Sequence, residues 1–232
     1  MFHPERDWDR VSSDLDEHGG AVLRGVLDSK QCEDYRDLFD HHPERFRKSV
    51  KMERYRFGRG EYRYLARPYA PELERWREEL YQLLRPVALR WWEQLGREGP
   101  WPESLSEWTQ QCVSAGQQES STIVLKYRAG DWNALHRDLF GDFFFPLQMV
   151  VNLSRPGRDY EGGEFMLVEQ RPRAQSRGTV FSLSQGDACI FTTQERPVES
   201  KRGWSAAPVR HGVSTVTQGE RYALGIVLHE GS

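Results

Sequence analysis

Apolar residues recur at helical spacing through much of the first half of the chain. Trp8, Val11 and Leu15 lie three and four residues apart, which predicts a short helix ending at Gly19-Gly20. Pro86 lies inside the clearest pattern and is expected to kink or split that helix. The pattern starts at Pro71, and its apolar positions are Leu73, Trp76, Leu80, Leu83, Leu84, Val87 and Trp91.

Between these helical stretches, two shorter segments have an extended pattern. Residues 21–27 are apolar enough for a short strand. Residues 52–65 alternate loosely and carry four aromatic side chains, which favours a hairpin that turns at 58–60. Those aromatic side chains are Tyr55, Phe57, Tyr62 and Tyr64.

The pattern changes after a stretch rich in glycine and proline at 98–102. Short apolar runs follow one another, with glycine-containing turns such as Gly130-Asp131 and Gln218-Gly219 between them. This is typical of an antiparallel sandwich or jelly roll. The predicted strands are 122–128, 143–153, 164–169, 179–183, 188–193, 211–216 and 222–229.

Together these patterns predict an α+β fold, a double-stranded β-helix with a helical N-terminal layer packed on one sheet. The 232 residues suit a single domain, 1–232, with a mainly helical part at 1–119 and a β-sandwich core at 120–232. A helical layer over one sheet would also bury many of the eight tryptophans.

Composition narrows the functional classes. The three cysteines show no zinc-binding spacing and do not suit a disulfide scaffold, so a cytoplasmic location is expected. No apolar run is long enough to span a membrane, and residues 1–10 do not resemble a signal peptide. A net charge of -3 disfavours nucleic-acid binding by the whole surface but allows a local basic patch.

The strongest chemical signal is His136-Arg137-Asp138. In extended backbone, side chains at i and i+2 point the same way, so an imidazole and a carboxylate could bind one metal ion. A third ligand could come from His211 or from His229, each on a predicted strand. Two histidines and one carboxylate form the facial triad of non-haem Fe(II) oxygenases. By itself, however, such a pair is more typical of a loop in which the two side chains hydrogen-bond the backbone or pair with Arg137.

Further motifs occur in a definite order along the second half of the chain. They are Tyr127, Gly130, His136-x-Asp138, VVNLS (150–154), GGEF (162–165), GDACIF (186–191) and RHGVSTVTQGERYALGIVLH (210–229). This order resembles the Fe(II)/2-oxoglutarate-dependent dioxygenase superfamily, in its prolyl-4-hydroxylase-like branch, over about residues 120–230. The segments 145–165 and 169–177 further resemble a bacterial group of this superfamily whose label is oxidative dealkylation of damaged DNA.

The resemblance implies a role for each matching residue. His136, Asp138 and His211 would hold Fe(II), and Arg221 would bind the distal carboxylate of the cosubstrate 2-oxoglutarate, with Tyr127 donating a hydrogen bond to it. The enzyme would use O2 to hydroxylate a C–H bond while 2-oxoglutarate is decarboxylated to succinate. Halogenating members of the superfamily have a small residue in place of the carboxylate, so Asp138 implies hydroxylation, or dealkylation through a hydroxylated intermediate.

The spacing of His211 and Arg221 constrains the fold. A flat hairpin at Gln218-Gly219 would leave the two side chains too far apart to bind one small diacid. We therefore expect the chain to cross between the two sheets at this turn.

Residues near the metal ligands in sequence are candidates for substrate contact. Trp132 and the phenylalanines around Phe144 could stack on a base or wall an apolar pocket. Gln148 and Asn152 share a face of one predicted strand and could face the substrate or satisfy buried backbone. Arg171 and Arg173 lie in a basic loop that could meet an anionic substrate or remain a solvated surface loop.

Three functions therefore compete at this point. The first is an oxygenase acting on a small-molecule or amino-acid-like substrate. The second uses the same chemistry on alkylated nucleic acid, which the charge of -3 and the pI near 6.2 disfavour. The third is a metal-binding β-sandwich without oxygenase activity. The sequence predicts no oligomeric state.

Overall fold

Four α-helices and two 3-10 helices form in the part of the chain that the computed structural model describes, residues 7–138, 143–171, 174–201 and 203–231. The helices are α1 (Trp8–His18), α2 (Ser29–His41), α3 (Pro71–Gln94) and α4 (Leu105–Ser114), with η1 (Pro43–Arg45) and η2 (Met52–Tyr55). None of the helices in these ranges combines the length and apolar character that a membrane span needs.

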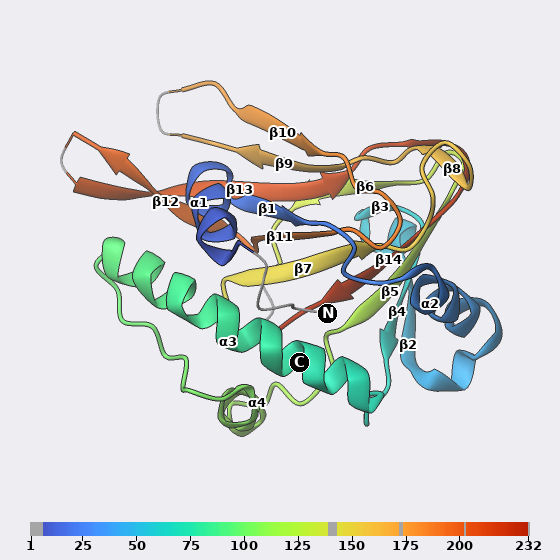
Figure 1. Cartoon of the computed structure of the whole chain (residues 1–232), viewed down its shortest axis with the longest axis horizontal. Coiled ribbons are helices and arrows are strands. Elements are labelled where there is room, and N and C mark those ends of the chain that lie inside the picture. The colour runs from blue at the N-terminus through green and yellow to red at the C-terminus, as the bar shows by residue number, and fades with distance from the viewer. Residues whose placement is uncertain (1–6, 139–142, 172–173, 202, 232) are drawn as a thin grey trace.

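The strands form two antiparallel sheets stacked on each other (Figure 1). The larger sheet has the order β1 (Gly20–Leu23), β11 (Ala188–Thr192), β7 (Leu147–Asn152), β14 (Val216–Ile226), β5 (Ile123–Arg128), β4 (Glu61–Leu65) and β2 (Phe46–Lys51), with β8 (Tyr160–Gly162) paired to β14. The smaller sheet has the order β10 (Arg177–Phe181), β9 (Phe165–Glu169), β13 (Gly203–Val213), β6 (Trp132–His136) and β3 (Gly58–Arg59), with β12 (Glu195–Ser200) paired to β13. The predicted α+β jelly roll is confirmed.

The helices cover the outer face of the larger sheet, as the sequence predicts. In Figure 1, α3 runs along that sheet beside β7, with α4 below it. The tryptophans Trp76, Trp91 and Trp108 are fully buried in the core between helices and sheet. Apolar burial of such large rings is the main stabilising contribution of this layer. Helix α3 continues unbroken through Pro86, so of the two expected effects of this proline, a kink or a split, the split is wrong.

The N-terminal half also supplies strands, more than its pattern predicted. Strand β1 pairs with β11, while β4 pairs with β5 and β3 pairs with β6. The segment 46–65 therefore contacts an edge of each sheet and closes one side of the sandwich. Its strands β3 and β4 do not pair with each other, so the expected hairpin at 58–60 is wrong. Because strands of both halves pair in both sheets, we propose that the chain forms one domain.

The crossing between sheets predicted before Arg221 is confirmed, but its position differs. Strand β13 belongs to the smaller sheet and β14 to the larger one, and Ser214-Thr215 connects them. Gly219 lies inside β14, paired with Tyr160 of β8. A Cβ at Gly219 would stand 2.0 Å from the Asp159 carbonyl oxygen, so this glycine serves a close backbone approach and not the turn.

A buried ion pair ties the last residues to α3. The side chains of Arg77 and Glu230 are each 1% exposed, and their closest nitrogen and oxygen atoms are 2.9 Å apart. Arg67 also contacts the same Glu230 oxygen, and Glu74 lies 3.6 Å from Arg77 on the solvent side. Since removing one partner leaves the other charge buried, this pair is expected to hold the C-terminal segment in place.

We expect Glu230→Gln to lower the free energy of unfolding by about 3 kcal/mol, because Arg77 would remain charged and buried. Urea denaturation followed by circular dichroism measures this loss. The matched control is Glu74→Gln, which removes the half-exposed partner of the same guanidinium and should cost less than about 1 kcal/mol. Equal losses in the two variants would contradict the role assigned to Glu230.

Candidate active site

The three predicted metal ligands converge between the two sheets. His211 on β13 lies directly opposite His136 on β6, and Asp138 follows β6 by two residues. The Nε2 atom of His136 is 3.3 Å from Asp138 Oδ1, and that of His211 is 3.2 Å from Asp138 Oδ2. One ligand atom from each residue lies within 4.8 Å of the others. Two imidazoles and a carboxylate at this separation fit the donor set of a non-haem Fe(II) site.

A bulge in β6 sets the direction of these side chains. The register shifts between the His211–His136 pair and the Val213–Asn133 pair, so β6 has one more residue than β13 over this stretch. As a result Asn133 and His136 both line the interior, although they are three residues apart. Leu135 is left on the outside, where it is 42% exposed.

Hydrogen bonds fix the orientation of the metal-ligand candidates. The Nδ1 atom of His136 is 2.6 Å from the Ala134 carbonyl oxygen, which selects the tautomer with Nδ1–H as donor and leaves Nε2 free to bind a metal. The Gln148 amide donates to Asp138 Oδ2 over 2.6 Å. Gln148, predicted to face either the substrate or the backbone, thus supports the carboxylate.

The charge states of Asp138 and His211 suit metal binding. Burial would raise the pKa of Asp138, but the facing His211 and His136 outweigh it and hold that pKa well below its usual range. Burial lowers the pKa of His211. Burial also opposes charge on His136, whose contact with Asp138 prevails and raises its pKa. At neutral pH the carboxylate is therefore ionised and His211 is a neutral donor.

A cavity of about 310 Å³ joins these residues to the other predicted site residues. Its wall includes the three candidate ligands together with Gln148, Tyr127 and Arg221. Phe191 and Phe165 pack near the His211 ring, with centroid distances of 4.8 Å and 6.3 Å. The cavity is thus polar where these groups converge and apolar around them, as expected of a small-ligand site.

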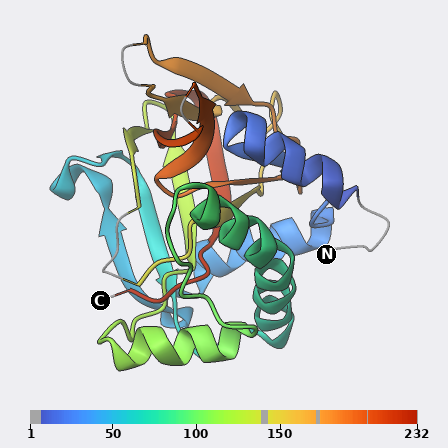
Figure 2. The ribbon, with the colours of Figure 1, turned by 90° about the vertical axis from the view of Figure 1, so that its left-hand side faces the viewer.

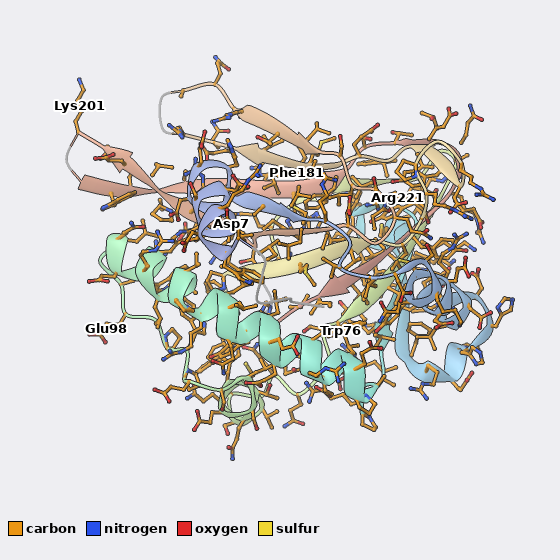
Figure 3. The ribbon with its side chains drawn as sticks, viewed as in Figure 1. Asp7, Trp76, Glu98, Phe181, Lys201 and Arg221 are labelled. Carbon is orange, nitrogen blue, oxygen red and sulfur yellow. The ribbon has the colours of Figure 1, made fainter. Side chains whose placement is uncertain are left out.

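Arg221 presents a buried positive charge to this cavity. It is 2% exposed, and Figure 3 places it among the strands at one end of the sandwich. Among the described residues, no carboxylate oxygen lies within 4.0 Å of its guanidinium, and its Nε atom has no hydrogen-bond partner. Its neighbours are the rings of Tyr127 and Tyr160, at 5.6 Å and 6.0 Å. Burial raises the pKa of Tyr127 to about 12, so its hydroxyl keeps its proton as a donor.

The histidine that competed with His211 lies outside the cluster. His229 is buried, and its Nδ1 accepts a hydrogen bond from the Phe145 backbone N–H over 3.2 Å. A neutral imidazole is needed for this contact. Burial lowers the pKa of His229 to about 4.

The other substrate candidates do not come together at the cavity. Trp132 lies on the outer face of β6 and is 42% exposed. Phe144 packs against Trp92 in the helical layer, at a centroid distance of 5.8 Å. Asn152 is buried, and its amide donates to the backbone carbonyls of Ser154 and Leu183.

The basic loop also lies apart from the cavity. Arg171 is paired with Glu169 over 2.6 Å, and neither residue lines the cavity wall. Glu169 in turn contacts the buried Arg196, so the pair belongs to a structural network. Arg173 lies outside the described residues.

One side of the cavity comes from residues that the sequence did not suggest as site residues. Segment 46–65 contributes Met52, Phe57, Tyr62 and Tyr64 to the wall, and β6 contributes Asn133. The alternating aromatics at 55–64 were the available signal. They lie near the metal-ligand candidates only because their strands pair with strands about 60 positions or more later in the chain. Sequence spacing alone therefore did not mark them as site residues.

The comparisons with known proteins identify an oxygenase, and its fold is one that a solved 2-oxoglutarate–Fe(II) oxygenase family protein shares. The chain belongs to the Oxygenase-NA family, whose model matches residues 60–231 and is described as "Oxygenase, catalysing oxidative methylation of damaged DNA". Two curated proteins of Mycobacterium tuberculosis, one from each of two strains and both uncharacterized, are 56% identical over 165 residues, 71% of this chain and 71% of theirs.

Solved structures share the fold at low identity. A Pseudomonas putida prolyl-4-hydroxylase is 15% identical with a TM-score of 0.56, covering 97% of this chain and 100% of its own. A 2-oxoglutarate–Fe(II) oxygenase family protein of Burkholderia pseudomallei is 15% identical with a TM-score of 0.53, covering 100% and 95%. A Trichoplax adhaerens prolyl hydroxylase, solved with a peptide of a hypoxia inducible factor, is 14% identical with a TM-score of 0.53, covering 97% and 93%.

The burial of His229 predicts a pH dependence of stability. The ordinary pKa is 6.5 and the folded pKa is about 4, so the unfolded chain binds the additional proton between these values. The contribution of His229 to the free energy of unfolding is therefore fully present above pH 6.5. It falls by about 3 kcal/mol as the pH drops towards 4. His229→Asn offers an oxygen to the Phe145 N–H without this titration.

We expect the loss of unfolding free energy between pH 6.5 and pH 4 to be smaller in His229→Asn than in the parent protein. Urea titrations at several pH values measure it, and the difference between the two proteins removes contributions from other groups. Between pH 7 and pH 8 both curves should run parallel, which serves as the internal control. An unchanged slope in the acid range would contradict the assignment.

Proposed function

We propose that His136, Asp138 and His211 hold Fe(II) and that Arg221 binds the distal carboxylate of 2-oxoglutarate. The observation that carries the proposal is the buried Arg221 guanidinium, which lines the same cavity as the triad and has no carboxylate partner among the described residues. A buried charge of this kind is costly unless an anion compensates it. The planar guanidinium matches a carboxylate through two parallel hydrogen bonds.

Each surrounding residue then has a defined task. When bound, iron and 2-oxoglutarate supply the oxidation of a substrate C–H bond by O2, with release of succinate and carbon dioxide. Gln148 holds Asp138 in its ligating orientation. Tyr127 keeps its proton, so its hydroxyl can donate a hydrogen bond to the carboxylate that Arg221 binds. Phe165 and Phe191 exclude water beside His211.

For the substrate, we propose an alkylated base of nucleic acid. The description of the family to which the chain belongs favours damaged DNA over the small-molecule substrate that composition favoured. Hydroxylation of an N-methyl carbon would give an N-hydroxymethyl group. Cleavage of its C–N bond would then release formaldehyde, and the hydroxyl proton would pass to the base nitrogen. A small-molecule or amino-acid-like substrate remains the second candidate, since the apolar cavity also suits it.

Anaerobic addition of Fe(II) and 2-oxoglutarate together should give a weak visible absorption band, and titration of this band measures both affinities. In Arg221→Ala we expect the affinity for 2-oxoglutarate to fall by about thirtyfold or more, because the anion loses its charged partner. The affinity for iron, measured by titrating Fe(II) into the same band at saturating 2-oxoglutarate, should change far less.

Gln148→Leu is the matched control, in which we expect iron binding to weaken and 2-oxoglutarate binding to persist. It should weaken iron binding by about tenfold or more, since Asp138 loses its orienting hydrogen bond, and leave the 2-oxoglutarate requirement at saturating iron near that of the parent. Equal losses of both ligands in Arg221→Ala would mean misfolding, and a band that survives in His211→Ala would contradict the iron site.

Methylated single-stranded DNA should stimulate succinate release by the holoenzyme, whereas the same oligonucleotide without methyl groups should not. Succinate and formaldehyde are measured together, because dealkylation forms one of each per turnover. Strong turnover on an amino-acid or metabolite panel, with no response to methylated DNA, would contradict the nucleic-acid substrate and favour the second candidate.

A further inference from the structure

Two exposed aromatic rings stand beside the cavity in a way that packing does not explain. Tyr55 and Phe57 are 55% and 44% exposed, and their rings stack at 5.6 Å with an interplanar angle of 18°. Phe57 also lines the cavity wall, so the stacked pair is continuous with the site. Large apolar side chains exposed together beside a cavity are typical of a binding surface.

The backbone between the two rings has an unusual conformation. Arg56 has φ 59°, in the left-handed region, and it is the one non-glycine residue of the described chain with positive φ. The loop is held by bonds from the Arg56 and Phe57 N–H groups to the carbonyls of Glu53 and Met52. Such conformations persist where the surrounding structure enforces them, and they concentrate at functional sites.

Arginines outnumber carboxylates in the loop that carries these rings, where Glu53 is the exposed acidic residue beside Arg54 and Arg56. Arg54, Arg56 and Arg137 are exposed, and none has a carboxylate oxygen within 4.0 Å among the described residues. Two neighbouring cations, by contrast, are neutralised by ion pairs: Lys51 is paired with Glu61, and Arg59 with Asp131. Arg137 also lines the cavity wall. The positive charge therefore gathers beside the exposed rings and the cavity.

The location makes this surface accessible to a large partner. Figure 2 shows the segment that includes these residues, in light blue, projecting from the side of the molecule opposite α1. A small molecule held inside the cavity would not reach Tyr55 or Arg54. A chain that passes the cavity would contact both.

We propose that residues 54–57, together with Arg137, bind single-stranded DNA on either side of the base that enters the cavity. Tyr55 and Phe57 stack on an adjacent base, and the arginines contact the phosphates. This assignment rests on the proposed nucleic-acid substrate and adds the residues that bind it and the form they select. Stacked rings interleaved with unpaired arginines match the recognition of single strands, whose bases expose their faces. In a duplex those faces are covered by neighbouring base pairs.

Binding of a fluorescein-labelled single-stranded oligonucleotide of mixed sequence, without alkylated bases, tests the proposal by anisotropy. Tyr55→Ala/Phe57→Ala should weaken binding by about tenfold or more. Tyr55→Phe should retain the parent affinity, because the ring face remains. A duplex of the same sequence should bind the parent protein more weakly than the single strand.

The arginines are tested through the salt dependence of the same binding. Arg54→Ala/Arg56→Ala should reduce the slope of log K against log salt concentration by about 0.7 for each phosphate that is no longer bound. The matched control, Arg10→Ala/Arg75→Ala, removes the same charge from exposed positions on α1 and α3. Trp204→Ala, on the hairpin whose Lys201 lies at the far left of Figure 3, is the control for an exposed aromatic.

The proposal is overturned if the Tyr55/Phe57 variant binds as the parent does, or if either control variant weakens binding as much as its matched partner. These outcomes are separable from failure of the oxygenase function. A protein that forms the Fe(II)–2-oxoglutarate band but binds no single strand disproves only the 54–57 surface. One that binds the strand through Tyr55 and Phe57 but forms no band disproves only the oxygenase assignment.

Discussion

A buried guanidinium in a largely apolar cavity is the interaction on which the site depends. Arg221 is enclosed by Tyr127 and Tyr160, whose rings offer a favourable but weak partner for its charge. A buried Arg–carboxylate pair within the protein, such as Arg77 with Glu230, satisfies both charges and leaves neither for a ligand. Arg221 has no such partner among the described residues, so an entering diacid supplies its missing charge.

The jelly roll makes this charge useful because it brings His211 and Arg221 to one cavity. The two residues are ten positions apart on consecutive strands, which would separate them widely in a flat ribbon. Here β13 ends in the smaller sheet and β14 begins in the larger one, so both side chains point into the space between the sheets. The β6 bulge then turns His136 into the same space, opposite His211.

The sequence predicted the parts of this arrangement that depend on short spacing or on a motif. His136, Asp138, His211, Arg221 and Tyr127 form such a set, and the structure gathers all five at the cavity. It did not predict the β6 bulge, the position of the crossing at Ser214-Thr215 or the wall formed by Tyr62 and Tyr64. Each of these depends on strand pairing between distant segments, which local periodicity does not encode. Phe144 illustrates the same limit, because its position relative to the sheet face was decided by packing against α3.

Net charge shows why a whole-chain average is a poor guide to substrate. The value of -3 includes acidic residues on every surface, and many basic residues of this chain are neutralised by contacts such as Arg171 with Glu169. What a polyanion meets is the local field at the cavity entrance, where Arg54, Arg56 and Arg137 lack such partners among the described residues. Since phosphate contacts are made within about a Debye length, roughly 8 Å at physiological salt, distant acidic residues contribute little. A near-neutral protein can therefore present a basic, aromatic surface where its chemistry requires one.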